Sequence, residues 1–212
     1  MQITALGHSC VLIDDGARIL VDPGNLSTSW HGMGQLDAIL VTHQHPDHVD
    51  PQHIGALLES NPQAFVGVEA SVAEVIVLPQ RVHRFAVGES IELKSTRITT
   101  VGGLHAVIHP DYARFRNLGY LIVGASGKTL FHPGDSLETT PQGVDFACIP
   151  TFAPWGKVEE VIDFTRALDA ARGMLIHYAV LSDAGQAITA THIGNLCRTE
   201  LVKVAEGEPF EI

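Results

Sequence analysis

The sequence predicts an α/β fold in which two β-rich halves, each with helices on its outer side, face one another across a central sandwich. The main observation is an internal repeat: residues 9–24 align with residues 119–134 without a gap, and both copies end in Pro-Gly. A second pair of apolar runs, starting at Asp37 and Asp145, repeats at an offset two residues shorter. Such repetition indicates a duplicated structural unit. The alternative is that two similar hairpins converged by chance.

In the first half, residues 9–13 and 18–21 are β-rich runs joined by a turn that contains Asp15-Gly16, which indicates a hairpin. A buried strand is expected at 38–41. A helix should follow Asp50-Pro51, because the apolar residues after it have helical spacing, and Asn61-Pro62 should end it. The remaining expected elements are a strand at 64–68, a short helix opened by a capping box at Ser71–Glu74, and two antiparallel strands around 90–101.

The second half repeats this order. Strands are expected at 119–123, from residue 128 to about 132, and up to Pro150. A helix should run from Val158 to about Ala171, where Gly173 would end it. A buried strand at 174–176 and a final amphipathic helix containing His192 complete the chain.

The clearest functional signal follows the apolar run that ends at Val41. Within six positions lie His43, His45, Asp47 and His48. In an extended chain the first three of these share a face, while His48 approaches from another direction. Imidazole nitrogen and carboxylate oxygen are ligands that zinc-class cations accept. The pattern therefore predicts a metal site rather than a run of surface histidines.

This His-x-His-x-Asp-His pattern resembles the signature motif of the metallo-β-lactamase superfamily of metal-dependent hydrolases. The resemblance implies a four-layer αββα sandwich with an internal pseudo-two-fold duplication. It also implies two metal sites, the first held by His43, His45 and His105 and the second by Asp47, His48 and His177, with Asp135 bridging them. Each of the three downstream residues follows an expected strand, as the family's ligands do.

Six other residues are candidates for supporting roles. Asp22 matches an aspartate that braces the metal-binding loop in the family, although it could be an ordinary turn residue. His8 and His109 could line the pocket or be structural, and His132 could be structural or contact the ligands. The Trp155 side chain could form an apolar wall of the pocket or simply pack against its neighbours, and Lys157 could contact an anion. Four further histidines are expected to be structural or on the surface: His31, His53, His83 and His192.

The resemblance implies a hydrolase that binds two divalent ions, zinc by preference and manganese or iron as alternatives. A water shared by the ions would form a hydroxide that attacks a small ester, lactone, amide or phosphoester. Asp47 would be catalytic, by orienting the hydroxide or protonating the leaving group. Gly7-His8-Ser9 and His177-Tyr178-Ala179 resemble the L-ascorbate-6-phosphate lactonase-like branch. The alternative is a non-catalytic metal-binding protein, a sensor or subunit that retains the fold.

Composition and net charge limit the kinds of partner that the chain is expected to bind. A chain of 212 residues suits one domain over residues 1–212. Its net charge of −11 opposes binding to nucleic acid, so a small-molecule substrate is expected. No apolar run is long enough for a membrane helix, and the first residues do not resemble a signal peptide, so we expect a cytoplasmic protein without a membrane partner. The three cysteines indicate thiols rather than disulfides. The sequence does not determine the oligomeric state; a homo-oligomer is compatible with it.

Overall fold

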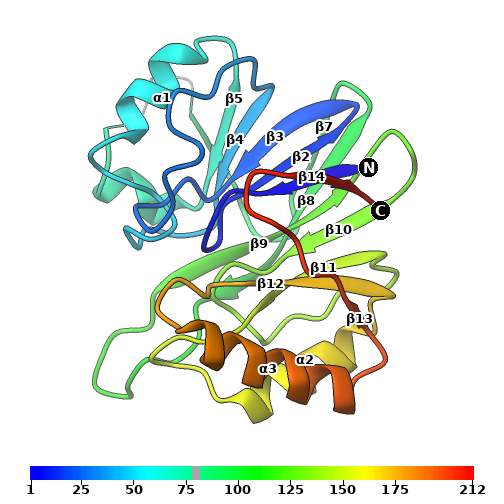
Figure 1. The fold of residues 1–212 in the computed structure, drawn as a ribbon. Coiled ribbons are helices and arrows are strands. Elements are labelled where there is room, and N and C mark those ends of the chain that lie inside the picture. Colours follow the sequence, from blue (N-terminus) through cyan, green and yellow to red (C-terminus); the bar gives the residue numbers. More distant parts are fainter. Residues whose placement is uncertain (78–81) are drawn as a thin grey trace.

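A computed structural model describes residues 1–77 and 82–212, and within these ranges the chain forms two seven-stranded sheets (Figure 1). The first sheet, in spatial order, consists of β14 (Pro209–Glu211), β1 (Gln2–Ala5), β2 (Val11–Asp15), β3 (Ala17–Val21), β4 (Ala38–Val41), β5 (Phe65–Val68) and β6 (His83–Arg84). The second consists of β13 (Glu200–Leu201), β12 (Arg172–Ile176), β11 (Phe146–Pro150), β10 (Thr129–His132), β9 (Arg116–Val123), β8 (Thr96–Leu104) and β7 (Ser90–Leu93).

The two sheets share one pairing pattern, which confirms the predicted repeat. In the first sheet, β14 to β3 pair antiparallel and β3 to β6 pair parallel. In the second, β7 to β10 pair antiparallel and β10 to β13 pair parallel. Even a detail recurs: the Asp37 carboxylate accepts the backbone N–H of Arg18, and the Asp145 carboxylate accepts that of Thr129.

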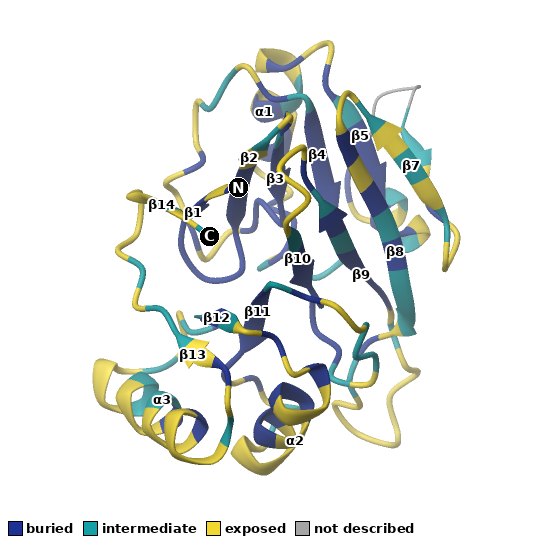
Figure 2. Ribbon diagram, turned by 90° about the vertical axis from the view of Figure 1, so that its right-hand side faces the viewer, coloured by how far each residue is buried: buried dark blue, intermediate teal, exposed yellow. Residues whose placement is uncertain are grey.

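The buried side chains form three clusters, one between the two sheets and one on the outer face of each sheet. The structure therefore has four layers, in the order helix, sheet, sheet, helices. Alternate residues of each strand point to opposite faces of its sheet. On β4, Ala38 and Leu40 join a core between the sheets, to which β9 contributes Tyr120 and Ile122. On the same strand, Ile39 and Val41 face the other way, toward α1 (Ile54–Ser60). A third cluster lies between the second sheet and the helices α2 (Val158–Leu168) and α3 (Asp183–Leu196). Figure 2 shows the outer faces of α2 and α3 exposed.

The helix ends differ from the sequence-based prediction. Helix α1 begins at Ile54, three residues later than Pro51 indicated, since the Asp50 carboxylate accepts the N–H of Gln52 in a separate turn. The predicted capping box at Ser71 is wrong: Glu69 caps a 3₁₀ helix, η1 (Ala70–Glu74).

The end of α2 was also mispredicted. The helix stops at Leu168, because Asp169 adopts a left-handed conformation with φ of 49°. Gly173 does not end the helix and lies in β12 instead. Among the described residues, no helix is both long enough and apolar enough to cross a membrane.

The strand ends position the predicted ligands. His43 follows β4, His105 follows β8, Asp135 follows β10 and His177 follows β12. Strands from both sheets therefore deliver polar side chains to one edge of the sandwich, where these residues lie close together.

Candidate metal centre

Two groups of histidines and aspartates lie at this edge. One contains His43, His45, His105 and Asp135, and the other contains His8, Asp47, His48 and His177. In each group, every residue offers an atom that lies within 4.8 Å of those offered by the others. All seven predicted ligands are thus brought together, and His8 joins them.

The loop that carries four of these residues rests on the turn after β3. A Cβ on Gly24 would lie 1.8 Å from the backbone oxygen of Asp47, so only glycine permits this contact. Two backbone hydrogen bonds, from Asn25 to Pro46 and from Asp50 to Pro23, hold the two segments together at 2.9 Å each. The sequence Asp22-Pro23-Gly24 therefore supports the ligand loop.

Asp22 is fully buried beneath this loop. Its carboxylate accepts hydrogen bonds from the backbone N–H and the hydroxyl of Thr42, each at 2.8 Å, and lies 2.7 Å from Nδ1 of His48. Burial lowers the pKa of His48, but the Asp135 and Asp22 carboxylates outweigh it and raise this pKa well above its usual value. Because Asp22 holds Nδ1 of His48, the other ring nitrogen, Nε2, faces Asp135, 3.1 Å away.

The first group presents imidazole nitrogens to one point. The Thr42 hydroxyl donates to Asp22 and accepts from Nδ1 of His43, which leaves Nε2 of His43 with a lone pair. That atom lies 3.1 Å from Nδ1 of His45. Two nitrogens on a tetrahedral zinc are about 3.3 Å apart, given Zn–N distances of about 2.0–2.1 Å. Burial and the neighbouring His48 lower the pKa of His43, so this imidazole is neutral, as a ligand must be.

His105 completes this arrangement. Its Nδ1 donates to the backbone oxygen of Ala106 at 2.7 Å, so its Nε2 is the free atom, 3.3 Å from Oδ2 of Asp135. The spacing of His43, His45 and His105 suits one cation.

In the second group, His177 faces two carboxylates. Its Nδ1 donates to the backbone oxygen of Phe152 at 2.7 Å, and its Nε2 lies 3.2 Å from oxygens of both Asp47 and Asp135. Burial lowers the pKa of His177, but contacts with Asp135 and Asp47 outweigh burial and raise this pKa to about 9. Positive charge at Nε2 is therefore favourable, and a divalent cation would supply it in place of the proton.

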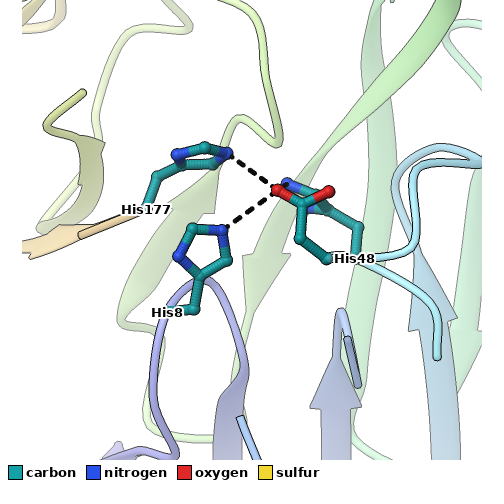
Figure 3. Close-up of side chains that lie close together, drawn as sticks. His8, His48 and His177 are labelled. Carbon is teal, nitrogen blue, oxygen red and sulfur yellow. Dashed lines mark hydrogen bonds and ion pairs between the residues drawn. The ribbon is translucent and has the colours of Figure 1, made fainter. Parts of the chain in front are cut away.

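The His8 ring lies beside that of His177, with ring centroids 4.2 Å apart, as Figure 3 shows, and it contacts the same oxygen of Asp47. The backbone N–H of Ala179 donates to Nδ1 of His8 at 3.2 Å, so the ring proton is on Nε2. Nε2 then donates to Oδ2 of Asp47, also at 3.2 Å. A nitrogen that carries this proton has no lone pair for a metal. His8 thus orients Asp47. Burial raises the pKa of Asp47, but the contact with His177 and the hydrogen bond from His8 outweigh burial and hold this pKa well below its usual value.

Asp135 lies between the two groups. Its Oδ2 contacts Nε2 of both His105 and His177, and its Oδ1 contacts Nε2 of His48. The indole N–H of Trp155 donates to Oδ2 at 3.2 Å. Burial raises the pKa of Asp135, but His48, His105 and His177 outweigh it and hold this carboxyl ionised.

Several of these atoms are buried and make no well-formed hydrogen bond, although they approach one another to 3.1–3.3 Å. They are Nε2 of His48, Nε2 of His105, Nε2 of His177 and Oδ1 of Asp135. Buried polar atoms without partners cost about 1–3 kcal/mol each, so their convergence on the same space requires an explanation. Divalent cations would satisfy all four, and the donor set of imidazole and carboxylate fits zinc-class ions.

Three predicted residues lie away from the two groups. His132 is buried beneath them and donates from Nε2 to the backbone oxygen of Ser9 at 2.9 Å. His109 is exposed, lies beside Asp111 and lines a separate cavity. Lys157 is exposed at the start of α2, and its backbone N–H donates to Glu160. The structure gives Lys157 no contact with the groups that could bind a metal.

Sequence reasoning missed Thr42 and Phe115. Thr42 hydrogen-bonds both Asp22 and His43, and its position directly before His43 was an available signal. The Phe115 ring packs against His45 with ring centroids 4.7 Å apart. Phe115 is 70 residues away in sequence, so no local pattern pointed to it.

Comparison with protein families supports the resemblance. The family model described as the β-lactamase superfamily domain matches residues 2–174. Protein Rv0786c of Mycobacterium tuberculosis is 38% identical over 209 residues, which cover 97% of each chain. The protein named UPF0173 metal-dependent hydrolase TTHA1283, from Thermus thermophilus, is 27% identical over 84% of each chain.

Solved structures share the fold. The metallo-β-lactamase fold protein YhfI from Bacillus subtilis superposes with a TM-score of 0.75 at 16% identity, over 99% of this chain and 98% of that one. CmlA from Streptomyces venezuelae, a diiron β-hydroxylase, superposes with a TM-score of 0.70 at 15% identity, over 96% of this chain and 53% of that one. With the matched family model and the two sheets described above, these similarities show that the chain belongs to the metallo-β-lactamase superfamily.

Proposed function

We propose that the chain is a metal-dependent hydrolase with two divalent cations and a small ester, lactone, amide or phosphoester as substrate. The observation that carries this proposal is the convergence of buried ligand-type atoms without partners from His48, His105, His177 and Asp135. The family membership and the metal-dependent hydrolase among its relatives support it.

The seven ligand-type residues would divide as their contacts suggest. His43, His45 and His105 would hold one ion, and Asp47, His48 and His177 the other, while Asp135 contacts histidines of both sets. We favour zinc, with manganese and iron as alternatives. Iron is among the alternatives because CmlA, which shares the fold, is a diiron enzyme. When bound, such ions act as Lewis acids and lower the pKa of coordinated water.

The protein's own residues would orient the reaction. Asp47 is ionised and fixed by His8, so it can accept a hydrogen bond from the attacking water and align it. Because this carboxyl is ionised, the orienting role is better supported than donation of a proton to the leaving group. Trp155 fixes Asp135 and forms one wall of the site, 5.8 Å from His105 between ring centroids.

The test combines a substrate screen with variants. Metal-replete protein is assayed against esters, lactones, amides and phosphoesters, with and without chelator. We expect chelator-sensitive turnover, lost in His45→Ala and Asp135→Ala and kept in His192→Ala, a control on the exposed side of α3. Inactivity toward every class, in protein that holds its metal, would favour the non-catalytic alternative. A cytoplasmic location stays a prediction.

A further inference from the structure

A cavity of about 170 Å³ opens in the segment between β8 and β9, which Figure 1 shows in green. Residues between 106 and 115 line it. This volume is below the roughly 300–1,000 Å³ of pockets that enclose a whole drug-sized ligand. The cavity therefore suits one part of a substrate, with the reacting bond outside it.

The cavity adjoins the candidate metal centre through three contacts. Phe115 lines the cavity and packs against the His45 ring. Arg114, also in the lining, donates from Nε to the backbone oxygen of His105 at 2.6 Å. The backbone N–H of Ala106 donates to the backbone oxygen of Asp135 at 2.7 Å. A group bound in the cavity would therefore lie beside the first set of metal ligands.

The lining is largely apolar yet open to solvent. Val107, Ile108 and Tyr112 are 51%, 38% and 68% exposed. Exposure of these apolar side chains to water is unfavourable. Burying them against an apolar group is favourable by about 25 cal/mol for each Å² of apolar surface removed from water.

The lining offers little to an anion. Its one arginine, Arg114, is paired with Glu138 and with the backbone oxygen of His105. The other basic side chain of the lining, His109, lies beside the Asp111 carboxylate, with Nδ1 3.6 Å from Oδ2. An anionic group would have to displace Glu138 to reach the Arg114 guanidinium.

We propose that this cavity binds a neutral apolar acyl or alkyl group of the substrate, which narrows the substrate to those esters, lactones, amides or phosphoesters that carry such a group. This inference rests on the proposed function and narrows its substrate class. Phe115 separates the apolar group from the metal centre, and Ile108 and Tyr112 contribute apolar surface to the cavity.

The first experiment measures hydrolysis of 4-nitrophenyl acetate, butanoate and hexanoate by the metal-replete protein. Burial of a methylene contributes about 0.8 kcal/mol, so kcat/KM should rise about three- to fourfold for each added methylene until the cavity is filled. The variant Ile108→Ser should flatten this rise mainly through KM. Ile188→Ser, on an exposed position of α3, is the matched control and should preserve it.

A second measurement uses the protein as purified and does not depend on turnover, because its probe, 1-hexanol, has no bond that the protein could hydrolyse. On addition of 1-hexanol, we expect amide NMR shifts concentrated in residues 106–115 in the wild type and in Ile188→Ser, and much smaller shifts in Ile108→Ser. If none of the three esters is hydrolysed, this measurement still decides the cavity's role, while the proposed function is decided by the screen of all four substrate classes.

Two results would overturn the inference. One is hydrolysis that is independent of chain length together with an absence of hexanol shifts in this segment. The other is a change of oligomeric state in Ile108→Ser, seen by light scattering, with an unaltered chain-length dependence. That result would assign the surface to contact between copies of the chain.

Discussion

At the scale of single residues, the two ring nitrogens of His8 have different partners. Nδ1 accepts from the backbone of Ala179, which is 171 residues away, and Nε2 therefore donates to Asp47. Partners that orient metal-binding side chains contribute to metal affinity without touching the ion. His8 is thus a positioning residue for Asp47 in the second group.

The variant His8→Ala tests this role. We expect the second ion to bind about 10–100-fold more weakly, the usual cost of losing such a partner, while two ions still bind at saturation. Metal titration by calorimetry measures both quantities, and His192→Ala serves as the control. Loss of one ion at saturating metal would instead identify His8 as a ligand.

The sequence predicted the residues of the site better than their roles. His43, His45 and Asp47 could be grouped because side chains two apart share a face of an extended chain. The role of His8 could not be assigned, since its ring proton depends on the distant backbone of Ala179. For His109 the sequence left pocket lining and a structural role open; its side chain is exposed beside Asp111 and lines the cavity between β8 and β9, away from the two groups.

At the scale of elements, the turn after β3 and the ligand loop form one unit. The backbone of Gly24 touches that of Asp47 so closely that a methyl group has no room. A side chain here would push the loop from beneath and move His45, Asp47 and His48 relative to His105 and His177.

Gly24→Ala should therefore weaken metal binding and lower the free energy of unfolding by about 1–3 kcal/mol, the typical effect of overpacking. Gly34→Ala is the matched control, because nothing lies within 4 Å of its added methyl group. Urea denaturation and metal titration give the two values. Equal behaviour of the two variants would show that the loop does not depend on this contact.

Element types were easier to predict than element ends. The hairpins and parallel strands followed from apolar runs and turn residues, and the repeat related one half to the other. The end of α2 depended on Asp169, which adopts the left-handed conformation that glycine adopts more readily. Gly173, the glycine that the sequence offers for this role, is a strand residue with the backbone of Ala147 next to it.

At the scale of the whole molecule, one core joins the two sheets. Tyr120 of the second sheet is fully buried and donates its hydroxyl to the backbone oxygen of Val41 in the first, at 2.8 Å. Since Val41 precedes the ligand loop, this contact links the sheet interface to the site. We propose on this basis that residues 1–212 form one domain.

A single domain should unfold in one cooperative step. Trp30 packs in the first half and Trp155 lies at the site in the second, so the variants Trp30→Phe and Trp155→Phe each leave one fluorescent probe. We expect each variant's fluorescence transition in urea to coincide with its own circular dichroism transition. Separate transitions within either variant would show that the two halves unfold independently.

Two divalent ions should occupy the groups around Asp135. Elemental analysis of metal content per chain tests this directly, on protein purified without chelator or added metal and again after reconstitution with zinc, manganese or iron. We expect about two ions per chain in the wild type and in His192→Ala, and a clear loss in Asp135→Ala. Absence of bound metal in the wild type after reconstitution, or full retention in Asp135→Ala, would contradict this expectation.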